Sequence, residues 1–517
     1  MPALGLKRPP YPIPLRLSRV ATAGRIGDAV GIVSGDSTDA LIKTLRQAAR
    51  HGQLHDFAPE IADTELDPAA GATWPREREV PADLLRTVLL EPDLRPDPRG
   101  LHLRGVLVTG NLDVNHVVLP CPLVLTHSHL TERATLNYAT LPRLNLSICH
   151  LPGLSLIGAR LEGGAFLGGL TATGGVNALN AQITGPLDLR GAILNNEGGW
   201  ALNLDGARVD GVAPLNGLTA TGAVRAPLAT ITSALDLEGA ILNNEGGYAL
   251  NLEVARVEAL YLRNVRHVQG TLILRRARIG YLIVEDSPVG RLPGPLVASG
   301  WQIQDIRGGL RSDRRLAAKW LATQPEFVPQ PWHALADVYA RNGQPADARR
   351  LRLEAAHRTT KNAPPGSKQA RWLYGLVVGY GYYPLLAAVW LVALLIIASA
   401  LIATQTKTFV PTNPTAAATA ISRSATAKTT TTATTPRTVP TVTGATACAR
   451  LGNRYPCLRP LLFSLDVVLP PTVGAGQANA WRPAANWLAY LLTGLKVFGW
   501  VLTALLLAGV TGLLRKV

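Results

Sequence analysis

The sequence predicts a mainly β protein, in which a right-handed parallel β-helix is followed by a short helical hairpin and two transmembrane α-helices. The segment Gly-Ala-Ile-Leu-Asn-Asn-Glu-Gly-Gly stands at 191–199 and returns 48 residues later, at 239–247. A fixed period of this size indicates a repeat architecture. Two stretches, 384–403 and 497–514, carry no charge. Each approaches the roughly 20 apolar residues that a helix needs to cross a bilayer.

The repeat region, 96–300, is expected to form the β-helix. It contains short Leu-x-Leu units separated by turns rich in Gly, Asn and Asp. Alternation at period two puts both leucines on one face of a short strand. We therefore expect stacked coils, roughly eight of about 24 residues, in a rod of about 40 Å. The leucines expected to point inward are Leu189, Leu204, Leu237 and Leu252.

The regions beside the rod are expected to close its ends. Residues 1–95 comprise a basic, Pro-rich segment and two short capping helices, at 38–51 and 81–90. Such caps protect the edges of the terminal coils. Residues 301–371 follow the spacing of a single tetratricopeptide-like hairpin, which serves as a cap or spacer or, alternatively, as a docking surface.

The C-terminal part is expected to span the plasma membrane twice, at 384–403 and 487–514. No run of about 7 to 15 apolar residues follows the basic N-terminus, so no secretory signal is predicted. Lys368 and Arg371 precede the first span, and basic residues also follow the second, so both termini should be cytoplasmic. The outer loop then comprises a disordered Thr/Ala/Pro-rich stalk, 404–447, and an extracytoplasmic segment, 448–486, that contains the apolar stretch Pro460–Gln477.

The charge is strongly positive, with a formal net charge of +16 and a pI near 10.0. With membrane spans present, an anionic cytoplasmic leaflet explains this charge more simply than nucleic acid does, and each basic residue near the leaflet contributes on the order of 1 kcal/mol. The residues expected to face the lipid are Arg349, Arg350, Arg352, Arg358, Lys361, Lys368 and Arg371.

The chain has four cysteines, too few for a disulfide framework. Cys448 and Cys457 are close together in the predicted outer segment, where thiols can oxidise, so they are the candidate disulfide. Cys121 and Cys149 are expected to be small buried apolar residues of the rod.

Several segments carry a family resemblance. They are Gly-Gly-Tyr-Ala-Leu-Asn-Leu-x-x-Ala-Arg-Val from 246, Asp-Pro-Arg-Gly-Leu-His-Leu-Arg-Gly from 97, Gly-Tyr-Gly-Tyr-Tyr-Pro from 379, Phe463 to Pro470 and Gly499 to Gly509. Over about residues 75–517, except the stalk, the chain resembles an actinobacterial two-span membrane protein family with pentapeptide-like β-helix repeats. Its members are commonly catalogued as membrane-associated oxidoreductases, so the resemblance implies a redox activity.

The residues themselves assign no catalytic, cofactor-binding or metal site. There is no Gly-x-Gly-x-x-Gly between a strand and a helix, and no Cys-x-x-Cys. A metal site could be drawn from His127 and His129 with Cys149-His150 one coil later, but the histidines are interpreted as solvated surface residues. Glu197 and Glu245 should align at one corner about 10 Å apart, wider than most paired carboxylates in hydrolases.

These observations favour a membrane-tethered scaffold that presents a cytoplasmic rod to a protein partner, without a cofactor and without nucleic acid. The external interaction segment would include Phe463, Asp466, Pro470 and Gln477. One alternative is an ion-channel-like two-span subunit, because Thr472-Val-Gly-Ala-Gly476 is similar to a potassium-channel filter but lacks its Tyr. The other is the oxidoreductase that the resemblance implies. Homo-oligomerisation is left open.

Overall fold

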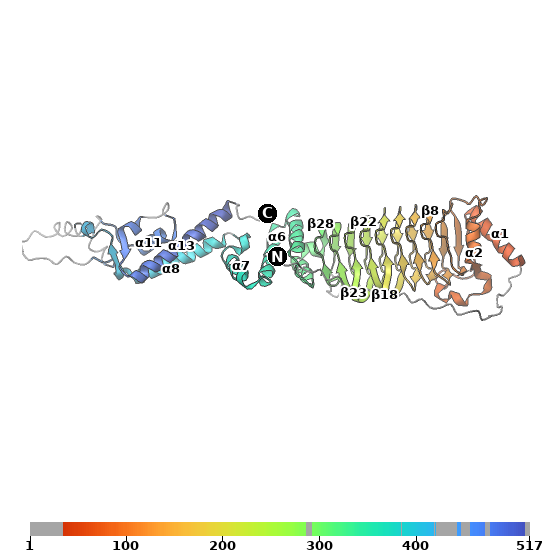
Figure 1. Cartoon of the computed structure of the whole chain (residues 1–517), viewed down its shortest axis with the longest axis horizontal. Helices are drawn as coiled ribbons and strands as arrows, with labels where there is room; N and C mark the ends of the chain where they lie inside the picture. Colours follow the sequence, from red (N-terminus) through yellow and green to blue (C-terminus); the bar gives the residue numbers. More distant parts are fainter. Residues whose placement is uncertain are drawn as a thin grey trace, which may run out of the picture.

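The computed structural model describes residues 35–285, 292–383, 385–417, 419, 442–445, 455–470 and 476–511. These residues form an elongated body (Figure 1). A parallel β-solenoid of about nine turns occupies one end, and two helices that are candidate membrane spans lie at the other. The basic first 30 residues, most of the Thr-rich stalk and Cys448 lie outside the described residues.

Three parallel sheets run along the described part of the rod. The first sheet contains β1 (Leu54–Asp56), β3 (Leu101–Arg104), β5 (Leu123–Thr126), β9 (Leu144–Asn145), β13 (Ala165–Phe166) and β17 (Leu187–Asp188). The second contains β2 (Glu79–Pro81), β4 (Leu107–Thr109), β6 (His129–Leu130), β7 (Ala134–Thr135), β10 (His150–Leu151), β11 (Leu154–Ser155), β14 (Thr171–Ala172), β15 (Val176–Asn177), β18 (Ile193–Asn203), β21 (Thr219–Arg225), β23 (Ile241–Asn251), β25 (His267–Ile273) and β27 (Leu296–Val297). The third contains β8 (Thr140–Leu141), β12 (Arg160–Leu161), β16 (Gln182–Ile183), β19 (Arg208–Val209), β20 (Ala213–Pro214), β22 (Thr230–Asp236), β24 (Arg256–Leu262), β26 (Arg278–Val284) and β28 (Gln302–Gly308).

The leucine repeat forms the core of the rod. Leu189, Leu204, Leu237 and Leu252 are all buried, with at most 2% of each residue exposed, which confirms their predicted inward orientation. In-register stacking explains this burial, because each inward side chain is covered by its equivalents in the coils on either side.

The 48-residue repeat consists of two unequal coils. Thr219 of β21 pairs with Ile241 of β23, 22 residues on, whereas Val224 pairs with Leu250, 26 residues on. The four additional residues belong to the Asn-Asn-Glu-Gly-Gly loop, which lies inside β23 and, in the preceding repeat, inside β18. The expectation of a corner is therefore wrong: each loop is a bulge in a long strand, because its extra residues have no partners in the ladder.

The N-terminal end of the rod is covered by α1 (Gly35–His51) and α2 (Ala82–Leu89), close to the two predicted capping helices (Figure 1). The 3-10 helices η1 (Pro68–Thr73) and η2 (Arg76–Arg78) lie between them in sequence. β1 and β2 pair with β3 and β4, so the solenoid begins before residue 96.

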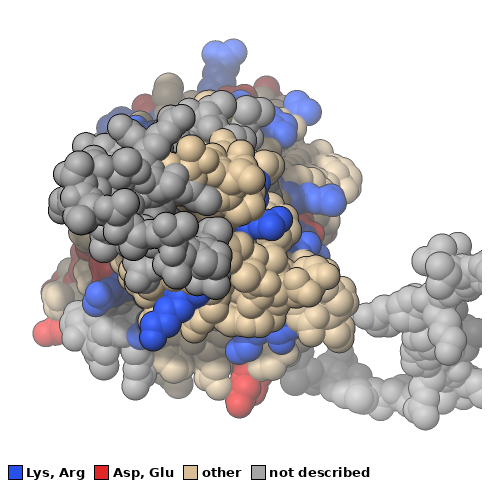
Figure 2. All heavy atoms as spheres, turned by 90° about the vertical axis from the view of Figure 1, so that its left-hand side faces the viewer, with Lys and Arg blue, Asp and Glu red and all other residues tan. Residues whose placement is uncertain are grey.

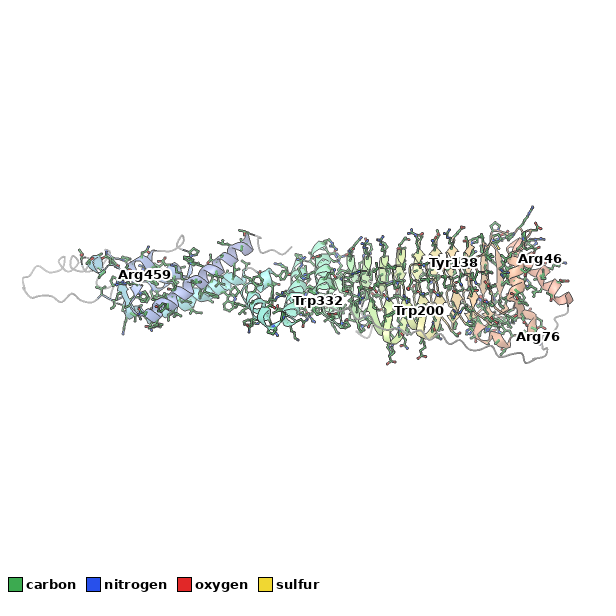
Figure 3. The ribbon with its side chains drawn as sticks, in the orientation of Figure 1. Arg46, Arg76, Tyr138, Trp200, Trp332 and Arg459 are labelled. Carbon is green, nitrogen blue, oxygen red and sulfur yellow. The ribbon has the colours of Figure 1, made fainter. Side chains whose placement is uncertain are left out.

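The other end of the rod is covered by α3 (Gly309–Ser312), α4 (Arg314–Leu321), α5 (Pro329–Arg341) and α6 (Pro345–Lys361). Trp320 and Trp332 are fully buried in a hydrophobic core that is continuous with that of the rod. Figure 3 labels Trp332 at this end of the rod. Arg341 donates to the carbonyl oxygens of Ile303 and Gln304 in β28, the last strand of the third sheet. These helices therefore satisfy and cover an exposed sheet edge.

The remaining helices lead away from the rod. They are α7 (Pro365–Val378), η3 (Gly379–Gly381), α8 (Leu386–Thr404), η4 (Thr406–Thr408), α11 (Pro460–Val468), α12 (Gln477–Ala480) and α13 (Asn486–Val510), with a small antiparallel pair of β29 (Phe409–Pro411) and β30 (Trp481–Pro483). α8 and α13 are long and apolar enough to cross a membrane. Only 28% of the most apolar 18-residue stretch of α8, and 17% of that of α13, is buried within the structure. Seen along the long axis from this end, Lys and Arg outnumber Asp and Glu on the visible surface (Figure 2).

Candidate functional site

The predicted interaction segment folds between the two candidate spans. Phe463 of α11 is buried, with its ring centroid 5.1 Å from that of Phe409. Gln477 is also buried, accepts from the backbone N–H of Arg459 at 3.0 Å and donates to the carbonyl of Cys457 at 2.8 Å. These two side chains hold the segment together and offer little surface to a partner.

Asp466 holds the two ends of the segment together. Its carboxylate accepts from the backbone N–H groups of Gly476 at 3.1 Å and Ala478 at 2.9 Å, at the start of α12. A carboxylate at the first turn of a helix satisfies N–H groups that have no partner within the helix. Pro470 is half-buried at the end of the described part of this loop. Of the filter-like residues 472–476, only Gly476 is described, and 472–475 lie outside the described residues.

α11 reaches far down α13. The backbone of Val468, at the end of α11, lies so close to Gly499 that a Cβ there would stand 2.3 Å from the Val468 carbonyl oxygen. Trp500 donates from Nε1 to the carbonyl of Leu469 at 3.3 Å. Val468 also shares an apolar cluster with Leu394 of α8 and Leu502 of α13. Since Gly499 is near the middle of α13, α11 is a short helix that enters between the two long ones to about half their depth.

Of the two cysteines of the candidate disulfide, one is described. Cys457 is half-buried just before α11, and Cys448 lies outside the described residues. The disulfide therefore stays a prediction. Cys121 and Cys149 are buried, as expected, and burial raises the pKa of the Cys149 thiol to about 12.

The histidines are not solvated surface residues, and that prediction is wrong. His127 and His129 are each only 8% exposed, and the His129 ring stacks on that of His150 with centroids 5.2 Å apart. His129 Nδ1 lies 2.8 Å from the carbonyl oxygen of Pro68, because η1 folds over this part of the rod. Among the described residues no group of three or more His, Cys, Asp or Glu side chains could hold a metal ion.

The repeated glutamates are exposed at the tips of their bulges. Glu197 and Glu245 lie in loops that are closed by an asparagine side chain; Asn196, for example, donates to the carbonyl of Trp200 at 2.9 Å. Trp200 is 45% exposed and carries the guanidinium of Arg225 at 4.7 Å from its ring centroid. These contacts explain the shape of the loop without any catalytic role for the glutamates.

The basic residues before the first span divide into two groups. Arg352 and Arg358 are partly buried and paired. Arg352 pairs with Asp337, and Arg358 pairs with Glu354 at 3.1 Å. The exposed members are Arg349, Arg350, Lys361, Lys368 and Arg371.

One feature of the rod was missed by the sequence reasoning. One column of paired positions in the third sheet contains four arginines, and we call it the arginine column. In successive coils it runs Arg160, Gln182, Arg208, Thr230, Arg256, Arg278 and Gln302. The four arginines are exposed. The signal was present as a recurring Ala-Arg followed by an aliphatic residue, at 159–161, 207–209, 255–257 and 277–279.

Arg256 and Arg278 are direct neighbours in this column. Arg208 pairs with Asp210 at 2.7 Å, whereas neither Arg256 nor Arg278 has an ion pair among the described side chains. Adjacent strands lie about 4.8 Å apart, and like charges directly opposite each other are destabilising. Beside them lies a groove of about 420 Å³ in which Gly280 contributes no side chain; its lining also includes Thr232, Glu258, Gln302 and Gln304.

Comparisons of the chain with protein-family models, curated proteins and solved structures find no match.

Proposed function

We propose that the chain is a membrane-tethered scaffold whose rod binds an acidic segment of a partner protein along the arginine column. The in-register pair Arg256 and Arg278 carries the proposal, because two neighbouring cations without an ion pair in the described structure, at a groove whose lining contains a single carboxylate (Glu258), favour an anionic partner. A rigid stack of coils holds the column in a fixed geometry, which reduces the entropy lost on binding. We take the coils to be right-handed, as parallel crossover connections almost always are.

Site-specific photo-crosslinking in native membranes tests this function. A photoreactive residue at Gln304, beside the groove, should capture one protein, whereas the same residue at Arg133, an exposed site outside the third sheet, should not. The captured protein should present an acidic segment at the crosslink, and the double variant R256E/R278E should abolish its capture. Equal capture from both positions, or capture that survives the charge reversal, would refute the proposal.

We further propose that both termini and the rod are cytoplasmic. Lys368 and Arg371 stand before α8, and cytoplasmic flanks are enriched in such residues. Single-cysteine variants in a background without native cysteines test the topology: a thiol at Ser367 should react with an impermeant reagent only after permeabilisation, and one at Thr430 should react on intact cells. The reverse pattern would contradict it.

A second candidate function is a pore-forming subunit, and the depth of α11 favours it. A short helix that enters between two spans and ends at mid-depth brings non-helical backbone to membrane depth, which is tolerated only inside protein or beside a water-filled cavity. Several copies would be needed to enclose a pore. Purified protein in planar bilayers should then pass a selective ion current. Absence of any such current would contradict the pore and leave the scaffold as the one proposed function.

A further inference from the structure

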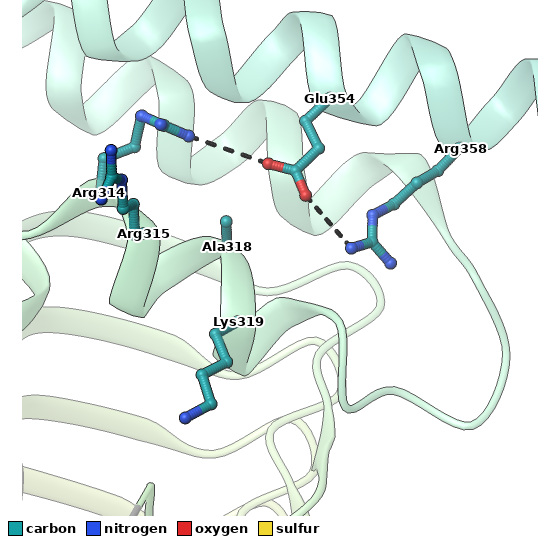
Figure 4. A pocket seen from close by; sticks show the side chains of 6 residues that line it. All are labelled: Arg314, Arg315, Ala318, Lys319, Glu354 and Arg358. Carbon is teal, nitrogen blue, oxygen red and sulfur yellow. Dashed lines mark hydrogen bonds and ion pairs between the residues drawn. The ribbon is translucent and has the colours of Figure 1, made fainter. Parts of the chain in front are cut away.

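A second concentration of positive charge lies outside the rod, in a pocket between α4 and α6 (Figure 4). Its lining consists of Arg314, Arg315, Ala318 and Lys319 from α4 and Glu354 and Arg358 from α6. Four cations thus surround one carboxylate. The pocket holds about 280 Å³, close to the lower end of the range for small-molecule sites, which begins at about 300 Å³.

The one carboxylate in the lining does not neutralise this pocket. Glu354 lies 3.1 Å from Arg358 but 3.8 Å from Arg314, and Arg314 is 3.7 Å from Asp347 behind it. Both Arg314 distances exceed that of a hydrogen bond, so this guanidinium has no hydrogen-bond acceptor among the described residues. Arg315 and Lys319 are exposed at the rim and have no ion pair within the described structure.

The position of Arg358 adds an independent observation. Its Nε is buried without a hydrogen-bond partner in the described structure, and its guanidinium lies 4.9 Å from the ring centroid of the buried Trp332. The indole ring lies on one side of this guanidinium, and the Glu354 carboxylate lies between Arg314 and Arg358 (Figure 4), so two neighbours restrain the Arg358 side chain. A guanidinium group that is held in one orientation can donate two parallel hydrogen bonds to two oxygens of one phosphate group.

We propose that this pocket binds a phosphoryl group, carried either by a soluble phosphate compound or by a phospholipid headgroup. A phosphoryl oxygen between Arg315, Lys319 and Arg314 would supply the missing acceptor, with Ala318 leaving room at the floor. The site is distinct from the arginine column, and its existence does not depend on the scaffold function.

Titration calorimetry of the full-length protein with inorganic pyrophosphate tests the site. The double variant R315Q/K319Q should weaken pyrophosphate binding at least about tenfold, because two charge-assisted contacts are lost. The matched control R311Q/R350Q removes the same charge from exposed arginines of α3 and α6 that do not line the pocket, and it should bind within about twofold of the native protein. All variants should keep the native unfolding temperature, since none of the four side chains is buried.

The lipid environment distinguishes the two sources of the phosphoryl group. In nanodiscs that contain phosphatidylglycerol, a headgroup ligand should compete and lower the apparent affinity for pyrophosphate relative to phosphatidylcholine nanodiscs, whereas a soluble ligand predicts equal affinities. Either result supports the site. Absence of saturable pyrophosphate binding in phosphatidylcholine nanodiscs, or equal weakening by the pocket and control variants, would overturn it.

Discussion

Arg104 of β3 donates from Nη1 to both carboxylate oxygens of Asp56 in β1, at 2.9 and 2.8 Å. The same guanidinium donates to Asp63 at 2.7 Å and to the carbonyl oxygens of Ala58 and Ile61. The Arg104 side chain is only 10% exposed. One buried cation thus fixes the loop after β1 to the first coil of the rod.

Replacing Arg104 by Met should destabilise the N-terminal coil by about 2 to 4 kcal/mol. Removing one partner of a buried ion pair costs about 3 to 5 kcal/mol. The lower figure allows for Asp63, which is 67% exposed and can be solvated by water. Urea unfolding of the full-length protein in detergent measures the loss, and D63N serves as the milder control. A loss no larger than that of D63N would show that the Asp56 pair contributes little.

Acid should weaken the same end of the rod. Burial lowers the pKa of His127 and His150 below the ordinary value of 6.5, and the neighbouring His129 lowers that of His150 further, while Asp63 and Asp67 respectively oppose the shifts. With folded pKa values below the unfolded ones, the unfolded chain binds protons more readily, so stability is complete above about pH 6.5 and falls as the pH decreases. The unfolding temperature measured from about pH 7.5 to 5 should decline, less so in H150Q. A pH-independent profile would contradict the burial of these rings.

Truncating an inward leucine tests the stacking of the coils. L237A should cost about 2 to 5 kcal/mol, because neighbouring coils hold the backbone in place and the cavity cannot collapse. The control E197Q, at the exposed tip of a bulge, should change stability by less than about 0.5 kcal/mol. Similar losses in the two variants would contradict the solenoid.

The candidate disulfide is open to direct measurement. Cys448 and Cys457 are separated by eight residues, and closing so short a loop stabilises by about 2.5 to 3 kcal/mol in the chain-entropy model. Non-reducing mass spectrometry of the native protein should find them joined. Two free thiols would refute the pairing and would also weaken the proposal that this segment is extracytoplasmic.

The core of the rod was predictable from sequence because stacking is a local rule: a residue such as Leu237 recurs at the same position in every coil, so its orientation follows from alternation alone. The lengths of the individual coils could not be predicted in the same way. A 48-residue period is consistent with two coils of 24, and only the pairing of Thr219 with Ile241 and of Val224 with Leu250 reveals coils of 22 and 26.

The sites depended on contacts distant in sequence. His129 is buried because η1, about 60 residues earlier, folds over it; a Cβ on Gly71 would lie 2.1 Å from that of His129. The phosphoryl pocket likewise joins α4 to α6, and neither helix has the charge pattern alone. The arginine column is different, because its repeated Ala-Arg pattern was readable once the coil length was known.

The depth of α11 provides a paired test within one helix. Gly499 and Gly494 both lie in α13, but an added Cβ would stand 2.3 Å from the Val468 carbonyl at Gly499, whereas it would meet nothing within 4 Å at Gly494. Alanine is favoured over glycine in a helix by about 1 kcal/mol, so G494A should be neutral or stabilising. G499A must displace a backbone carbonyl, and we expect it to lower the unfolding temperature in detergent and to speed hydrogen exchange in α11. Identical behaviour of the two variants would show that α11 does not lie against the middle of α13.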